Sequence, residues 1–142
     1  MTDAPRPEND SGRRGAVAII VRDGRMLVIR RSQWVRAPGT ICFPGGGIQD
    51  GESEEAALVR ECREEIGLTV QPLRRLWECT TAWHVRLAWW QAAVDAAAVP
   101  LANPAEVESV HWVTPAEMAA LPAVLESNQE FLRLLARGAI VL

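Results

Sequence analysis

Hydrophobic and polar positions along this chain follow two periods, and their order predicts the succession of strands and helices. Residues 15–21 and 25–31 are rich in β-branched and aliphatic side chains and flank Asp23-Gly24, a dipeptide that favours a β-hairpin turn. A loop is expected after this hairpin, because Pro38-Gly39 marks a bend. Further strands are expected at 41–43, 73–83, 85–94 and 109–113.

Three segments carry the signals that start and stop helices. Ser53 is a good N-cap for a helix that ends at Ile66, where Gly67 provides the stop. Residues 114–117 form a capping box with proline at the first helical position, which predicts a short helix. Residues 127–130 repeat this pattern and predict the start of a terminal helix. The order of elements is that of a mixed α/β fold with helices packed on a sheet.

Composition places the chain among globular proteins of one domain. It has 142 residues, of which 49% are hydrophobic and 23% charged. Residues 1–14 are polar and rich in turn formers, so a flexible tail is expected there, followed by one domain over 15–142. A net charge of -3 argues against binding to a nucleic-acid polymer, whereas free nucleotides stay compatible if a metal supplies positive charge.

The location of the protein is expected to be the cytoplasm. No apolar run approaches the roughly 20 residues that cross a bilayer, and the first residues lack the pattern of a signal peptide. The three cysteines are odd in number and lack the spacing of a metal site, which favours reduced thiols. They are Cys42, Cys62 and Cys79.

The first predicted helix carries three acidic residues close together. Its expected core stripe consists of Leu58, Cys62 and Ile66. Glu61, Glu64 and Glu65 gather on another face, where like charges repel by about 0.2–0.5 kcal/mol per pair. A solvated face would tolerate this repulsion, and a bound cation would remove it. The glycines at 45–47 let backbone approach closely, and carboxylates with a bared carbonyl suit a hard cation such as Mg²⁺ or Mn²⁺.

These residues also have the spacing of a known family motif. Gly46, Glu52 and the run Arg-Glu-Cys-Arg-Glu-Glu-Ile-Gly-Leu at 60–68 match the Nudix box, with Cys62 where a bulky aliphatic residue is usual. The chain therefore resembles the Nudix hydrolase family, over about residues 15–137. The resemblance implies an α/β/α sandwich with a mixed β-sheet, in which the box forms loop-helix-loop.

The resemblance implies a role for each residue of the box. Glu61 and Glu65 would hold the divalent metal, Mg²⁺ or alternatively Mn²⁺. Glu64 would be a further ligand or the base that orients the attacking water, and the carbonyl of Gly45 would be a backbone ligand. The structural residues of the box would be Gly46, Glu52, Arg60 and Gly67. Among these, Glu52 and Arg60 are expected to form a salt bridge that ties the loop to the helix.

Residues outside the box are expected to complete the site and to choose the substrate. A further carboxylate is expected from Glu106 or Glu108, with Glu106 slightly preferred. Arg30, Arg31 and Arg36 precede the glycines and are candidates for phosphate contacts. Two of the six tryptophans, Trp34 and Trp83, are placed to stack on a nucleobase, although core packing explains most tryptophans.

Three hypotheses about function follow from this resemblance. The first is a Mg²⁺-dependent pyrophosphohydrolase that cleaves a nucleoside di- or triphosphate linked to another moiety, through attack of water at phosphorus. The alternative is a non-catalytic nucleotide-binding sensor of the same fold, in which the acidic positions are usually eroded. An isomerase similar to isopentenyl diphosphate isomerase would depend on Cys42. The expected partner is a small nucleotide-type molecule, with no membrane, and a homodimer is compatible with the family.

Overall fold

A computed structural model describes residues 13–142. Most of the expected tail, residues 1–12, lies outside the described residues, and Arg14 is already the first residue of a strand. The elements are β1 (Arg14–Arg22), β2 (Arg25–Arg31), β3 (Ile41–Cys42), β4 (Gly45–Gly47), α1 (Glu54–Ile66), β5 (Gln71–Thr80), β6 (Arg86–Ala93), β7 (Val107–Val113), α2 (Pro115–Ala119) and α3 (Glu126–Ala136).

The strands form one mixed sheet in the order β3-β2-β1-β6-β5. β1 runs parallel to β6 and antiparallel to β2 and β4, and β7 pairs with β2. The first two strands are joined by the expected hairpin turn, in which Asp23 and Gly24 have φ of 54° and 75°. Two consecutive positive φ values are typical of the tight turn that matches strand twist.

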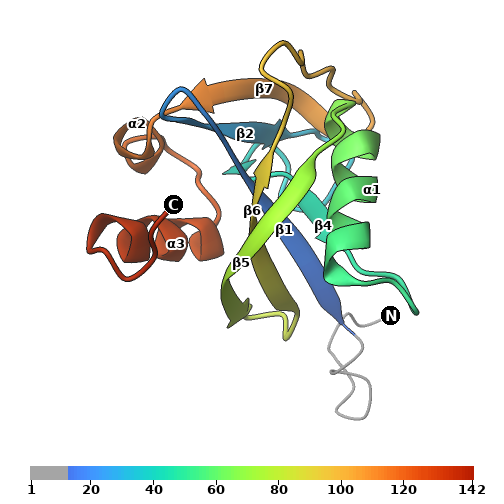
Figure 1. The fold of residues 1–142 in the computed structure, drawn as a ribbon, viewed down its shortest axis with the longest axis horizontal. Helices are drawn as coiled ribbons and strands as arrows, with labels where there is room; N and C mark the ends of the chain where they lie inside the picture. The colour runs from blue at the N-terminus through green and yellow to red at the C-terminus, as the bar shows by residue number, and fades with distance from the viewer. Residues whose placement is uncertain (1–12) are drawn as a thin grey trace.

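Helices cover both sides of the sheet, as Figure 1 shows, with α1 on one side and α2 and α3 on the other. The side chains of β1 separate two cores. Ala16, Ala18 and Ile20 pack with the buried residues of α1, whereas Val17 and Ile19 pack with those of α3. This alternation is the two-residue period of a strand buried on both faces. The predicted α/β/α sandwich with a mixed sheet is therefore confirmed.

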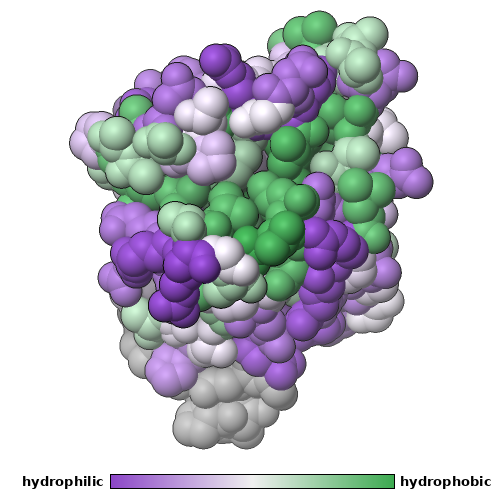
Figure 2. Space-filling model, turned by 60° about the vertical axis from the view of Figure 1, so that its left-hand side comes forward, coloured by the Kyte–Doolittle hydropathy of each residue, from purple (hydrophilic) through white to green (hydrophobic). Residues whose placement is uncertain are grey.

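The face on the α2 and α3 side is brought forward in Figure 2, where apolar side chains gather into a central patch with a polar rim. These two helices border a groove of about 320 Å³, which includes Met118, Leu121 and Leu132. Within residues 13–142, no helix is both long enough and apolar enough to cross a membrane.

The terminal helix begins differently from the prediction. The capping box expected at 127–130 is wrong, because α3 already starts at Glu126 and Leu125 is its N-cap, without a side-chain cap. Ser127 therefore lies inside the helix. The side chain of Asn128 is buried and accepts a hydrogen bond from the backbone N–H of Phe43 at 2.8 Å. Asn128 thus joins α3 to the segment that precedes β4 and does not take part in a capping box.

The strands also differ in places from the predicted ones. Strand β5 ends at Thr80, so residues 81–83 belong to the turn that leads into β6. Strand β7 begins at Val107, two residues earlier than expected, because its pairing with β2 extends to Arg31. The glycines at 45–47, expected as a loop, form the short strand β4.

Candidate active site

Local sequence signals position α1 as predicted. The hydroxyl of Ser53 accepts a hydrogen bond from the N–H of Ala56 at 3.0 Å, and Gly67 adopts φ 64° at the C-terminal end. A left-handed residue at this position favours glycine, since it has no Cβ to clash. Leu58, Cys62 and Ile66 are fully buried, which fixes how the helix is turned against the sheet.

This orientation gives the three acidic residues of α1 different environments. Glu65 is 6% exposed, because it lies at the border between the core stripe and the acidic face. The side chain of Glu61 is 13% exposed, and that of Glu64 is 51% exposed. The single acidic face expected from the sequence is therefore graded from buried to solvated.

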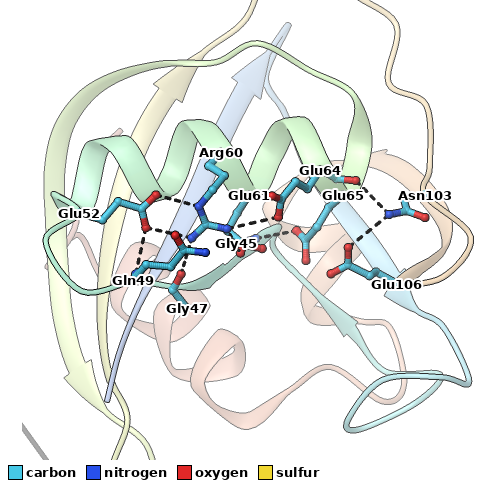
Figure 3. Close-up of polar contacts among 10 residues, drawn as sticks. All are labelled: Gly45, Gly47, Gln49, Glu52, Arg60, Glu61, Glu64, Glu65, Asn103 and Glu106. Atoms are coloured by element: carbon cyan, nitrogen blue, oxygen red, sulfur yellow. Dashed lines mark hydrogen bonds and ion pairs between the residues drawn. The ribbon is translucent and has the colours of Figure 1, made fainter. Parts of the chain in front are cut away.

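Two of these carboxylates converge with a third from a distant part of the chain. Glu61, Glu65 and Glu106 each offer one oxygen, and these oxygens lie within 4.8 Å of one another (Figure 3). The alternative, Glu108, instead places its carboxylate 3.9 Å from Arg30. The geometry thus favours Glu106 over Glu108. We call Glu61, Glu65 and Glu106 the carboxylate cluster.

The carboxylate cluster has the donor chemistry of a site for a hard divalent cation, which prefers oxygen ligands. Burial raises the pKa of Glu65 to about 8, and the neighbouring charges of Glu61 and Glu106 act in the same direction. Burial also raises the pKa of Glu61, against the opposing effect of Arg60. Buried, mutually repelling carboxylates gain from a cation that they share, so the residues present fit a divalent metal.

The raised pKa predicts how stability without metal depends on pH. Folded Glu65 has a pKa of about 8 against an ordinary value of 4.5, so between these values the folded state binds more protons than the unfolded state. The free energy of unfolding should therefore fall by a few kcal/mol as the pH rises from 4.5 to 8. Thermal melts in EDTA across this range test the prediction, and Glu65→Gln should flatten the profile. A profile that rises with pH in both proteins would contradict it.

Arg60 links the structural part of the box to the acidic residues. Its Nε donates to Glu52 Oε2 at 2.7 Å, so the expected salt bridge is present, and Nη2 donates to the carbonyl of Gly47 at 2.8 Å. The same guanidinium also contacts Glu61 at 2.7 Å and Glu64 at 3.3 Å. Arg60 thus offsets part of the negative charge beside the carboxylate cluster.

Two of the three glycines of β4 pack closely against neighbouring groups. The backbone N–H of Gly45 donates to Glu65 Oε1 at 3.0 Å, which fixes the buried carboxylate. A Cβ at Gly45 would overlap the backbone of Ala16 on β1. A Cβ at Gly46 would overlap the carboxylate of Glu61, while the same position at Gly47 is open. The carbonyl of Gly45 as a metal ligand stays a prediction.

A cleft of about 490 Å³ runs beside β4, between the β5–β6 turn and the start of α3. Arg31, Arg36 and Trp83 line it, and their contacts with a substrate stay a prediction. Trp83 is 56% exposed and lies under the Arg36 guanidinium, 5.8 Å from ring centroid to Cζ. Trp34 is 73% exposed but does not belong to the lining of the cleft.

Two residues of this region were missed from the sequence. Asn128 lines the cleft and was interpreted as part of a cap, because its contact with Phe43 spans 85 residues. Asn103 contacts both Glu64 and Glu106. The Asn-Pro dipeptide at 103–104 favours a turn, and no local signal indicates that this turn crosses the end of α1.

The fold and the site together define an α/β protein in which the glycines of β4 line a ligand-sized cleft and also contact the carboxylates of α1. The chain belongs to the Nudix hydrolase family, since the family model described as "NUDIX domain" matches residues 12–135. This is a family of enzymes that act on phosphoanhydride bonds.

Named relatives share parts of the sequence. The CTP pyrophosphohydrolase of Escherichia coli (strain K12) is 45% identical over 51 residues, which are 36% of this chain and 38% of that protein. The NAD-capped RNA hydrolase NudC of Stutzerimonas stutzeri is 26% identical over 110 residues, 75% of this chain and 38% of that protein. The chain thus matches well under half the length of these two relatives.

Solved structures share the fold over most of the chain. The MutT protein from Methanosarcina mazei Go1 has a TM-score of 0.76 at 21% identity, with 89% of this chain and 94% of that chain covered. The ORF135 protein of E. coli has a TM-score of 0.70 at 25% identity, with 89% and 91% covered. At these identities the likeness concerns the architecture.

Proposed function

We propose that the protein is a Mg²⁺-dependent pyrophosphohydrolase that cleaves a nucleoside di- or triphosphate linked to another moiety. The observation that carries this proposal is the carboxylate cluster, in which Glu61 and Glu65 of α1 meet Glu106. Glu106 lies 41 positions after Glu65 in the sequence. Mn²⁺ has similar ligand preferences and is the expected substitute.

The residues of the site have different roles in the proposed hydrolysis. Glu61, Glu65 and Glu106 would hold the cation, with the carbonyl of Gly45 as a further ligand. A bound divalent cation would offset the charge of the phosphates and lower the pKa of coordinated water. Glu64 reaches solvent beside this cluster, so we assign it to orient the attacking water, or to act as an additional ligand.

The cleft supplies the surfaces that a nucleotide needs. Its volume of about 490 Å³ is in the range of small-molecule sites. Arg31 and Arg36 offer positive charge for phosphates, and Trp83 offers an exposed aromatic face for a nucleobase. Trp34 lies outside the lining of the cleft, so its contact with a nucleobase stays a prediction.

A substrate screen tests the proposal directly. Relatives are named for acting on CTP, NAD-capped RNA, RNA and coenzyme A, so a panel of nucleoside triphosphates, dinucleotides, coenzyme A and 5′-triphosphate RNA covers these classes. We expect Mg²⁺-dependent products of phosphoanhydride cleavage, identified by mass, that EDTA abolishes. Ligand binding without turnover over hours on the whole panel would support the sensor instead.

Glu64→Gln tests the role given to the exposed carboxylate. We expect kcat to fall at least about tenfold, since general acid–base groups contribute this much or more, while the affinity for Mn²⁺ changes little. A loss of metal affinity as large as the loss of kcat would make Glu64 a ligand. Equal rates for the two proteins would exclude both roles.

The sensor hypothesis is disfavoured because the acidic positions are intact and converge. The isomerase hypothesis needs a reactive Cys42. This thiol is buried, and burial raises its pKa to about 11, so it stays protonated near neutral pH. Retention of activity in Cys42→Ala would dispose of this hypothesis.

The partners and the location are proposed from the sequence. The three cysteines are free thiols, as a reducing cytoplasm would keep them. We propose a small nucleotide-type substrate and no nucleic-acid polymer as partner, which binding assays test. A homodimer stays a prediction, which gel filtration tests.

A further inference from the structure

The segment between β6 and β7 crosses the C-terminal end of α1. The backbone N–H of Leu101 donates to the carbonyl of Ile66 at 2.8 Å, and that of Asn103 donates to the carbonyl of Glu65 at 2.8 Å. Carbonyls in the last turn of a helix lack partners within the helix, so this crossing satisfies them. The same crossing brings Glu106 to the acidic residues of α1.

Asn103 has contacts on both sides of this crossing. Its Nδ2 donates to the carbonyl of Glu64 at 3.2 Å and to Glu106 Oε2 at 3.3 Å (Figure 3). Its Oδ1 accepts from the N–H of Ala105 at 3.1 Å. Its carbonyl accepts from Glu106 at 2.9 Å and from Val107 at 2.8 Å. One planar amide thus joins the end of α1 to the carboxylate that comes from the loop.

We propose that Asn103 is a positioning residue that holds the Glu106 carboxylate toward the cation site formed with Glu61 and Glu65. The inference rests on the proposed function, because it gives Glu106 the role of a metal ligand. Repulsion from the two carboxylates of α1 would drive Glu106 outward into solvent. Among residues 13–142, Asn103 supplies the hydrogen bond that holds this carboxylate in place.

The chemistry of the amide suits this role better than a cation would. An arginine or lysine would hold Glu106 too, but its positive charge would compete with the divalent ion for the same carboxylate. The neutral Nδ2 donor orients Glu106 and leaves its full negative charge to the cluster. Partners of this kind around metal ligands typically change metal affinity by about 10- to 100-fold when removed.

Mn²⁺ binding measured by calorimetry tests the proposal without any substrate. Asn103→Ala should weaken the affinity for Mn²⁺ about tenfold. The matched control is Asp95→Ala in the same connecting segment, where Asp95 Oδ1 accepts from the N–H of Ala97 at 2.8 Å. Asp95→Ala removes a comparable turn hydrogen bond away from the cluster and should leave the affinity unchanged.

A second variant separates positioning from turn formation. Asn103→Asp keeps an oxygen for the Ala105 N–H but loses the donor to Glu106, so it should weaken Mn²⁺ binding at least as much as Asn103→Ala. In a Glu106→Ala background, Asn103→Ala should have no further effect, since residues that act through one another are not additive.

The outcomes distinguish this inference from the proposed function. If Glu106→Ala weakens Mn²⁺ binding and both Asn103 variants bind within twofold of the original protein, the positioning role is overturned while the function stands. Additive effects of Asn103→Ala and Glu106→Ala would also overturn it. If the original protein binds no Mn²⁺, both the inference and the proposed function fail.

Discussion

Replacing Glu65 with glutamine should lower kcat/KM for the proposed hydrolysis about 1000-fold and leave the protein at least as stable at pH 8. A metal ligand supplies about 4 kcal/mol of transition-state stabilisation, which corresponds to this factor. Burial raises the pKa of the Glu65 carboxyl to about 8, so keeping it ionised costs free energy. The amide of glutamine is neutral and removes this cost. Its oxygen can still accept from the N–H of Gly45, which preserves the local hydrogen bond.

Steady-state kinetics and thermal melts on the same preparations measure the two expectations. Glu55→Gln is the matched control, because Glu55 lies on the same helix and is exposed, so the identical substitution should change kcat/KM little. A Glu65→Gln enzyme that retains a tenth or more of the original activity would show that this carboxylate is not a ligand.

Gly46→Ala should lower kcat/KM about 100-fold with little change in the free energy of unfolding. The added Cβ overlaps the end of the Glu61 side chain, which is flexible and can move, so the fold tolerates the methyl group. The carboxylate of Glu61 moves when its side chain moves. A displacement of about 1 Å at a reacting centre lowers the rate about 100-fold. The same shift should weaken Mn²⁺ binding.

Gly47→Ala provides the control for this prediction. A Cβ at Gly47 meets open space, and its carbonyl keeps the hydrogen bond from Arg60. Kinetics, Mn²⁺ calorimetry and thermal melts on the two variants should therefore separate them. Equal activity of Gly46→Ala and Gly47→Ala would mean that Glu61 is elsewhere during catalysis. A large loss of stability in Gly46→Ala would mean that backbone, rather than Glu61, has to shift.

Features set by neighbouring residues were predicted from the sequence. The Asp23-Gly24 turn is present, and α1 begins after Ser53 and ends before Gly67, as the local cap signals indicated. The spacing of the Nudix box predicted the family and the Glu52–Arg60 salt bridge, which spans eight residues. These features depend on turn chemistry and helical periodicity, both of which act over a few residues.

Tertiary structure decided which groups meet in the site. The sequence placed Glu106 and Glu108 in the same loop, and only the crossing of that loop over α1 brings Glu106 to Glu65. The tertiary structure likewise decided that the side chain of Asn128 accepts a hydrogen bond from Phe43 instead of capping α3. Such contacts join residues tens of positions apart, and their free energy depends on burial against other elements. No local pattern of side chains encodes that burial, so it emerges only when the sheet and its helices pack together.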